Sequence, residues 1–290
     1  MDKVLQDARY LWKLCFPTDT EDFMDFYFAQ VARAEDTYIY YDAEGKPLAH
    51  IGLLRYGYKD RGAEALAYIS GACTHPEAQR QGLMGLLMRQ VIETERARGT
   101  EALILIPASE ELRGYYHRHF ALVDAAPRWT TSWALYVEAR LSARYTSIAS
   151  PTSAGLLSHY YRGTSHITYT EQQAEAIIAE YRHSTGALVL ESVCGGGSAG
   201  LLLARLEDGR SVIDCLIGKP SVQDELVHGL KERYPDNEIL VANLFADDIQ
   251  LELLEGKVGY SSEPWAMVLP LQSSSGYEGY RSLAVALVHN

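Results

Sequence analysis

The chain switches several times between helical and strand spacing of its apolar residues. Over the first 35 residues these recur every three or four positions, which predicts two helices with a turn around Pro17 between them. The core-facing residues of the two helices are Leu5, Ala8, Leu11 and Trp12, then Phe23, Phe26, Tyr27 and Val31. Residues 37–41, 47–58 and 65–74 are separated by the turn sequences DAEGK and KDRGAE, which predicts three antiparallel strands.

Helical spacing returns between Gly82 and Arg98, and Gly99 stands where a helix favours a glycine cap. The residues expected to face the core are Leu83, Leu86, Leu87, Val91 and Ile92. A short buried strand over 102–108, a short helix over 111–120 and an outer strand over 128–137 are then expected to close the first unit.

The second half runs through a similar order of elements. After a polar stretch around Pro151 it opens with helices near 153–161 and 170–183, the second begun by a capping-box pattern of Thr170 and Gln173. The expected strands are 188–193, 199–206, 211–217, 238–244 and 265–271, with a helix from Ser221 between the third and the fourth. The sequence therefore predicts two α+β units, residues 1–140 and 141–290, each with a mixed, mostly antiparallel sheet flanked by helices.

Length and composition narrow the classes of function. The 290 residues are about twice a typical domain, and a hydrophobic content of 47% with 22% charged residues is ordinary for a folded protein. The net charge of −12 disfavours nucleic acid as a partner and favours a positively charged one. No apolar run approaches the roughly 20 residues needed to cross a bilayer, so we expect a cytoplasmic protein without a membrane partner.

Cysteine is sparse. Cys15, Cys73, Cys194 and Cys215 stand far apart, with no CxxC pair and no histidine at zinc-ligand spacing. We therefore expect neither a disulfide framework nor a metal site. The sequence leaves the oligomeric state open, a homo-oligomer included.

The segment from Tyr68 to Arg89 carries the strongest chemical signal. A strand there runs through a glycine-containing loop into an amphipathic helix, so the first backbone N–H groups of the helix point out of the loop. Such a helix start binds anions, while Arg80 adds charge and Gly82 lets a ligand approach the backbone. The main-chain donors expected to bind a pyrophosphate belong to Gln79, Arg80, Gln81, Gly82, Leu83, Met84 and Gly85. On loop physics alone, a capped surface loop explains the segment equally well.

The same stretch resembles the acetyl-CoA-binding motif of the GCN5-related N-acetyltransferase (GNAT) superfamily, Q/R-x-x-G-x-G/A after a strand. Gln79 and Gly82 match, whereas Met84 stands where the family prefers Gly or Ala and Gly85 follows at once. The element order of residues 1–140 also resembles that fold. The resemblance implies two tandem GNAT-like folds, similar to the first two of the enhanced intracellular survival branch. It implies acetyl-CoA as co-substrate of the first fold and a degenerate second fold in residues 141–290.

The resemblance also implies roles for particular residues. The main chain of Ala72, Cys73 and Thr74 would hold the pantetheine arm, and a backbone N–H there would polarise the thioester carbonyl. The thiol of Cys73 is expected only to pack as a small apolar group. In the family, a tyrosine on the helix after the next strand protonates the departing CoA thiolate. In the text GYYHRHFALV, Tyr116 is the expected general acid and Tyr115 the reserve.

The expected activity is transfer of the acetyl group from acetyl-CoA to a primary amine by direct attack, without a covalent enzyme intermediate. The acceptor is a small-molecule or peptide amine, and the acidic balance favours a cationic one. A general base must deprotonate the ammonium, and the sequence does not decide among Glu64, His75, His117 and a water molecule. A non-catalytic acyl-CoA-binding protein is an alternative.

Two further motifs occur in the second half. Gly195, Gly197 and Gly200 match the dinucleotide pattern G-x-G-x-x-G, with Asp214 about 19 residues downstream. The run LLLARL that follows is too short for a crossover helix, so we favour a β-hairpin whose glycines supply positive φ.

Residues 196–200 also match G-x-S-x-G, which would make Ser198 the nucleophile of a serine hydrolase. Asp247 or Asp248 and then His289 follow in the order that such a triad requires. Ser198 comes late for this fold, because most of a hydrolase sheet must precede it. The hydrolase remains an alternative to the hairpin.

Overall fold

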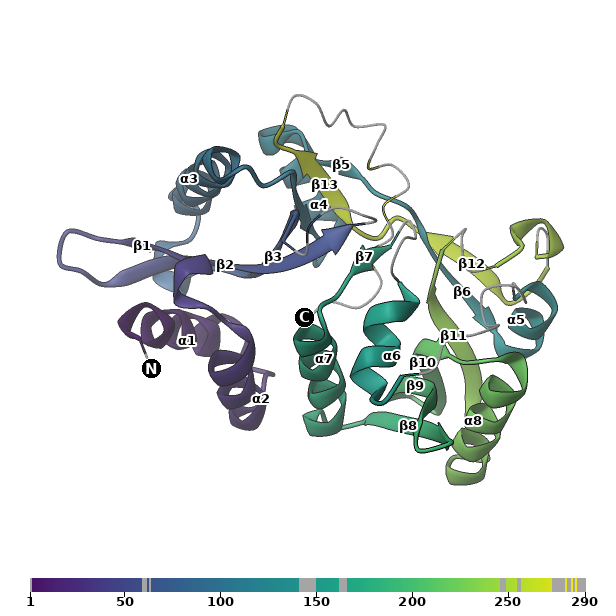
Figure 1. The fold of residues 1–290 in the computed structure, drawn as a ribbon. Helices are drawn as coiled ribbons and strands as arrows, with labels where there is room; N and C mark the ends of the chain where they lie inside the picture. The colour runs from purple at the N-terminus through teal and green to yellow at the C-terminus, as the bar shows by residue number, and fades with distance from the viewer. Residues whose placement is uncertain are drawn as a thin grey trace.

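The computed structural model describes residues 2–58, 62, 64–140, 150–161, 166–245, 249–254, 257–272, 280, 283 and 285. These residues form two mostly antiparallel sheets that lie side by side, with helices against both (Figure 1). The α+β class expected from the sequence is therefore confirmed. Among the described residues, no helix has the length and apolar character needed to cross a membrane.

The helices and strands follow one another in the order that the sequence predicts up to Phe120, and the short strand that comes next was not predicted. They are α1 (Lys3–Cys15), α2 (Glu21–Phe26), the π-helix η1 (Tyr27–Val31), the 3-10 helix η2 (Ala34–Asp36), β1 (Thr37–Tyr41), β2 (Pro47–Tyr58), β3 (Leu66–Thr74), the 3-10 helix η3 (Pro76–Ala78), α3 (Leu83–Arg98), β4 (Ala102–Leu105), α4 (Glu110–Phe120) and β5 (Val123–Asp124). The remaining elements are β6 (Arg128–Ser132), α5 (Trp133–Ala139), α6 (Ser153–Tyr160), β7 (Ile167–Thr168), α7 (Glu171–His183), β8 (Ala187–Cys194), β9 (Gly197–Glu207), β10 (Arg210–Ile217), α8 (Pro220–Arg233), β11 (Glu238–Leu244), the 3-10 helix η5 (Leu251–Leu253), β12 (Tyr260–Glu263) and β13 (Met267–Pro270).

The first sheet has the strand order β1-β2-β3-β4-β13-β5, with β7 beside β2. Helices α3 and α4 cover one face, and α1 with α2 packs around Trp12 on the other (Figure 1). The expected core face of α1 is buried. In α3, Leu86 is 48% exposed and not in the core, because it lies about a quarter turn away from the buried stripe of Leu83, Leu87 and Val91.

The two halves of the chain exchange one strand each. β13 comes from the second half, yet it lies between β4 and β5 in the first sheet, while β6 pairs with β11 and β12 in the second (Figure 1). The expectations that 128–137 closes the first sheet and that 265–271 belongs to the second are therefore wrong. The expected strand over 128–137 is also too long, because it ends at Ser132, whose side chain caps helix α5. Alternation shows that a segment is a strand but not which sheet it joins. A domain boundary at residue 140 stays a prediction. It does not divide the two sheets, because β6 lies before it and joins the second sheet, and β13 lies after it and joins the first.

The second sheet has the order β12-β6-β11-β10-β9-β8, and β10 pairs parallel with β11 as β3 does with β4. The capping box at the start of α7 is confirmed: the Gln173 N–H donates to Thr170 Oγ1 at 3.2 Å, and the Thr170 N–H donates to Gln173 Oε1 at 2.8 Å. Helix α7 also contacts α2 and η1, with the rings of His183 and Phe26 centred 5.6 Å apart. It therefore lies at the junction of the two halves.

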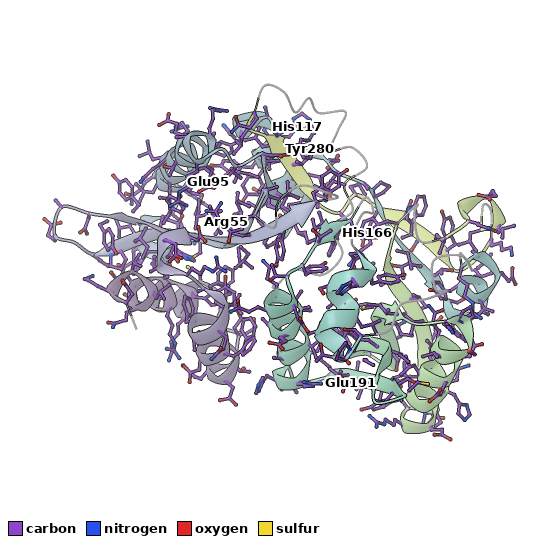
Figure 2. All side chains as sticks on the ribbon, in the orientation of Figure 1. Arg55, Glu95, His117, His166, Glu191 and Tyr280 are labelled. Carbon is purple, nitrogen blue, oxygen red and sulfur yellow. The ribbon has the colours of Figure 1, made fainter. Side chains whose placement is uncertain are left out.

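A buried ionic cluster ties β2 to α3 (Figure 2). The Arg55 guanidinium donates to Asp36 Oδ1 at 3.0 Å and to Glu95 Oε1 at 3.1 Å. The Glu95 carboxylate is fully buried and also accepts from the Thr100 hydroxyl at 2.5 Å and the Tyr38 hydroxyl at 2.9 Å. Burial by itself would raise the pKa of Glu95, but the hydrogen bonds from Arg55 and Thr100 lower it to about 2.

We expect this cluster to make the protein less stable in acid. Because the pKa of Glu95 is lowered from its ordinary value of 4.5 to about 2, the unfolded chain takes up a proton before the folded one does. The stabilisation is fully present above pH 4.5 and is lost as the pH falls toward 2. The free energy of unfolding in urea, measured between about pH 7 and pH 3, tests this. Glu95→Gln should show a shallower acid loss, and equal slopes in the two proteins would contradict the expectation.

Candidate active site

Strands β3 and β4 separate partway along their length. Their parallel pairing ends at Tyr68 and Ile104, and β4 stops one residue later, whereas β3 continues to Thr74. Beyond Tyr68, the edge of β3 that faces away from β2 has no strand beside it in the described part of the chain. Its main-chain N–H and C=O groups can pair with an extended polar ligand as they would with another strand.

A β-bulge distorts β3 within this opening. Between Ser70 and Cys73, β3 has one residue more than the segment of β2 that pairs with it. Gly71, within this bulge, has φ +60°. A Cβ at Gly71 would lie 2.2 Å from the Trp12 ring, so only glycine fits there. His50 Nδ1 lies 2.9 Å from the Gly71 carbonyl oxygen, and burial lowers the pKa of His50 to about 4, so a neutral imidazole donates to that carbonyl. The sequence pattern did not indicate the bulge or the role of His50.

The three residues expected to hold the pantetheine arm lie on this unpaired part of β3. Ala72 and Thr74 are half-buried, and Cys73 is buried. A hydrogen bond with the Cys15 thiol, together with burial, raises the pKa of Cys73, so its thiol stays protonated. The Cys15 thiol also donates to the Thr74 carbonyl oxygen at 3.4 Å. Cys73 is therefore a packing side chain, as expected.

The loop after β3 leaves the start of α3 open. Gly82 precedes the helix at φ +78°, and no side chain caps the first turn, whereas Ser109 caps α4. A Cβ at Gly82 would meet no atom within 4 Å. The backbone of Arg80 is also in the left-handed conformation, with φ +63°, and its side chain is exposed. The loop and the first turn of α3 hold all the expected anion-binding residues, which are Gln79, Arg80, Gln81, Gly82, Leu83, Met84 and Gly85.

Tyr115 of α4 points toward this helix start. Its hydroxyl lies 3.6 Å from the place that a Cβ would occupy at Gly85, in the first turn of α3. The Arg89 guanidinium lies 3.8 Å from the same place. Sequence reasoning did not include Arg89, although its position one turn after Gly85 puts it on the same helix face. Tyr115 and Arg89 thus flank the candidate phosphate site.

Tyr116 points into the protein instead. It is buried, and burial together with Tyr115 raises its pKa to about 12, so its hydroxyl is protonated at neutral pH. Helix α4 ends at Ala121 with φ +56°, a conformation in which glycine is usual.

The three side chains considered as general base do not meet at the opening. Glu64 precedes β3, at the end of the strand opposite Thr74, and pairs with Arg33 at 3.1 Å. His75 accepts a hydrogen bond from the Glu77 N–H at 3.3 Å. His117 is exposed on α4 (Figure 2). Within the described ranges, no group of three or more His, Cys, Asp or Glu residues is placed to hold a metal ion.

The second half lacks a comparable loop. Only Gly218 and Lys219 join β10 to α8, whereas residues 75–82 join β3 to α3. Pro220 in the first turn of α8 removes one N–H donor, and a Cβ at Gly200 would lie 2.3 Å from Val222 of the same helix. The start of α8 is therefore closed to a pyrophosphate.

The dinucleotide interpretation is wrong. Gly195 and Gly196, at φ +62° and +82°, form the turn of the β8–β9 hairpin, and a strand follows them where a dinucleotide site needs a helix. Asp214 lies within β10 and accepts hydrogen bonds from Arg205 Nε at 2.6 Å and from the Tyr181 hydroxyl at 2.9 Å. The hairpin predicted from the glycines is confirmed.

The hydrolase interpretation is wrong as well. Ser198 lies inside β9, is 5% exposed, and its hydroxyl is 2.9 Å from that of Ser153. A hydrolase nucleophile stands on an exposed strand-to-helix turn. Asp247, Asp248 and His289 lie outside the described residues.

Comparison with known proteins agrees with this geometry. Residues 2–120 match the acetyltransferase (GNAT) domain family, and no curated protein sequence matches the chain. A GCN5-related N-acetyltransferase from Kribbella flavida is similar in structure, with a TM-score of 0.60, 16% identity, and coverage of 93% of this chain and 70% of that one. Eis1 from Mycobacterium abscessus has a TM-score of 0.61 at 11% identity, covering 92% and 71%. A tandem GNAT protein from the clavulanic acid biosynthesis pathway has a TM-score of 0.50 at 12% identity, covering 93% and 96%.

The chain therefore has a tandem GNAT-type fold, and residues 2–120 carry the sequence signature of an acetyltransferase domain. This fold and this signature support acyl transfer as the class of activity.

Proposed function

We propose that the protein is an N-acetyltransferase that binds acetyl-CoA on its first half and transfers the acetyl group to a primary amine. The open start of α3 beside the unpaired edge of β3 carries this proposal. The main chain of residues 79–85, with Arg80 and Arg89, would hold the pyrophosphate. The main chain of Ala72, Cys73 and Thr74 would pair with the pantetheine arm. Bound there, acetyl-CoA supplies an activated acyl group as a thioester.

Transfer by direct attack requires a donor for the carbonyl oxygen and a general acid for the thiolate from this chain. A main-chain N–H at the bulge of β3 would donate to the carbonyl oxygen as negative charge develops on it. The amine nitrogen bonds to the carbonyl carbon and the C–S bond breaks. Tyr116 would then donate its phenolic proton to the departing thiolate, while the ammonium proton leaves to a base or to water. No enzyme side chain is acylated on this route.

We also propose that residues 141–290 are a degenerate GNAT-like unit without a cofactor of its own. The two-residue connection before α8 and the proline in its first turn support this. Because α7 contacts α2 and η1, this half would form a wall on the acceptor side of the first sheet.

Replacing Gly82 tests the cofactor site. Acetyl-CoA at about 100 times its Kd should stabilise the wild-type protein by about 2.7 kcal/mol, and Gly82→Trp should abolish this gain because the indole fills the open helix start. Thermal unfolding with and without acetyl-CoA measures the effect. Gly45→Trp is the matched control, because Gly45 has a similar φ of +82° and equally open surroundings in the β1–β2 turn.

A thermal shift that survives in Gly82→Trp would place the cofactor elsewhere. No shift in the folded wild type at millimolar acetyl-CoA would overturn the proposed function. Release of free CoA thiol that depends on an added amine then distinguishes transfer from binding without turnover.

A further inference from the structure

His50 of β2 is a buried histidine beside the bulge of β3. Its side chain is 2% exposed, and burial lowers its pKa to about 4, so the imidazole is neutral at neutral pH. Its Nδ1 atom lies 2.9 Å from the Gly71 carbonyl oxygen. Because a carbonyl oxygen only accepts hydrogen bonds, Nδ1 carries the proton and donates it to this bond. His50 therefore binds the main chain of the bulge.

The peptide group between Gly71 and Ala72 needs such a restraint. Glycine rotates easily about its backbone bonds, so Gly71 by itself does not hold this peptide group in one orientation. The Trp12 ring lies against Gly71 and is fixed in turn, because its Nε1 donates to Asp19 Oδ2 at 2.6 Å. The rings of Trp12 and His50 are centred 6.3 Å apart, so both lie on the α1 face of the sheet. The hydrogen bond from His50 selects one orientation of the peptide group.

That orientation directs the Ala72 N–H away from His50. In a trans peptide group the C=O and the N–H point in opposite directions, and the bond between Gly71 and Ala72 is trans. The Gly71 C=O points to the imidazole on the α1 face. The Ala72 N–H therefore points away from that imidazole.

The pairing of β2 with β3 gives a consistent direction independently. The His75 N–H donates to the Leu48 carbonyl oxygen at 2.8 Å, so the main chain of His75 faces β2. Along an antiparallel strand, successive residues direct their main-chain groups alternately toward the partner and away from it. Counted back from His75, Cys73 faces β2, whereas Thr74 and Ala72 face the other edge of β3. This is the edge from which β4 has separated, so the Ala72 N–H points into the opening.

We propose that His50 is a positioning residue for acetyl transfer, whose hydrogen bond to Gly71 holds the Ala72 N–H toward the thioester carbonyl oxygen of acetyl-CoA. The inference rests on the proposed function and names both the main-chain donor and the side chain that supports it. The bond from His50 keeps the peptide group from turning its own carbonyl oxygen into the opening, where it would repel the developing negative charge. It also polarises the peptide group, which makes the Ala72 N–H a stronger donor.

Infrared spectroscopy of acetyl-CoA, isotopically labelled at its thioester carbonyl and bound to the intact protein, tests this role without an acceptor amine. A hydrogen bond to the carbonyl oxygen lowers the C=O stretching frequency, so the wild type should show a red shift relative to free acetyl-CoA. His50→Leu has a similar volume and no donor, and it should lose at least half of this red shift. His50→Asn places an amide N–H near the position of Nδ1 and should restore it. The Kd for CoA, which has no acetyl group, should be the same in all three proteins.

Ser70→Ala is the matched control for His50→Leu. Ser70 is 4% exposed, precedes Gly71 on the same strand, and accepts a hydrogen bond from the Tyr27 hydroxyl at 3.0 Å. Its replacement should lower the thermal midpoint, because a buried hydrogen bond is lost, and leave the carbonyl frequency unchanged. An equal loss of red shift in both variants, or no loss in His50→Leu, would overturn the inference and leave His50 with a structural role only.

Nuclear magnetic resonance of the wild type, with isotope-labelled alanine, tests the donor even where His50→Leu does not fold. The amide proton of Ala72, assigned by its absence in Ala72→Gly, should move downfield when acetyl-CoA replaces CoA. An unmoved resonance would overturn the inference. Binding of acetyl-CoA without a red shift in the wild type overturns the inference alone, whereas no binding of acetyl-CoA overturns the proposed function and the inference with it. The two failures are therefore distinguishable.

Discussion

Tyr116→Phe should lower kcat for acetyl transfer by about 10²–10⁴-fold, the usual contribution of a positioned general acid. The phenyl ring keeps the packing of a buried side chain on α4, so the variant should fold and bind acetyl-CoA with an unchanged KM. The loss arises because the thiolate must leave without a proton donor. Steady-state kinetics at saturating acetyl-CoA and amine, with the thermal midpoint as a check on folding, measure the effect.

Tyr115→Phe is the matched comparison for Tyr116→Phe, because the two tyrosines are neighbours in the chain whose side chains point in different directions. The Tyr115 hydroxyl lies near Gly85 at the start of α3, so its removal should raise the KM for acetyl-CoA several-fold and leave kcat nearly unchanged. If Tyr115→Phe loses kcat and Tyr116→Phe does not, the two roles are reversed. If neither variant loses kcat, proton donation comes from another group.

Arg55→Leu should lower the free energy of unfolding by about 3–5 kcal/mol, the typical cost of removing one partner from a buried ion pair. Arg55 is 8% exposed and is bonded to both Asp36 and Glu95, which are 4% and 0% exposed. Its removal leaves these two carboxylates buried with Arg98 as the nearby cation, 3.3 Å from Asp36 and 3.1 Å from Glu95, and with the Thr100 and Tyr38 hydroxyls still bonded to Glu95. Urea denaturation at neutral pH measures the change.

Arg33→Leu serves as the control for Arg55. The pair of Arg33 and Glu64 is solvent-exposed on both sides, so its loss should cost less than about 1 kcal/mol. A similar small loss in Arg55→Leu would mean that solvent or Arg98 compensates the buried carboxylates. The cluster would then not stabilise the packing of α3 on β2.

Much of the candidate cofactor site is predictable from the sequence because it is local in the chain. The loop and helix start at residues 79–85 follow directly from a strand, a glycine and an amphipathic helix that are contiguous. The hairpin at Gly195 and Gly196 is predictable for the same reason, since the positive φ of its turn depends on the glycines themselves. The assignment of Tyr116 over Tyr115 as general acid came from the resemblance and stays a prediction.

The contacts between elements around β3 could not be predicted in this way. The bulge at Gly71 depends on contact with Trp12 and His50, which belong to other elements. Arg89 lies within the predicted helix, yet only its approach to Gly85 and Tyr115 gives it a place in the site.

The sequence by itself determined most helices and strands, the hairpin turns, the open loop before α3 and its absence before α8, although it predicted a strand where α5 is a helix. These follow from the spacing of apolar residues and from local backbone preferences, which act over a few residues. Only the tertiary structure decided which sheet β6 and β13 join and where β3 separates from β4. A strand with the right alternation can pair with any free edge, and its choice depends on the packing of the whole chain.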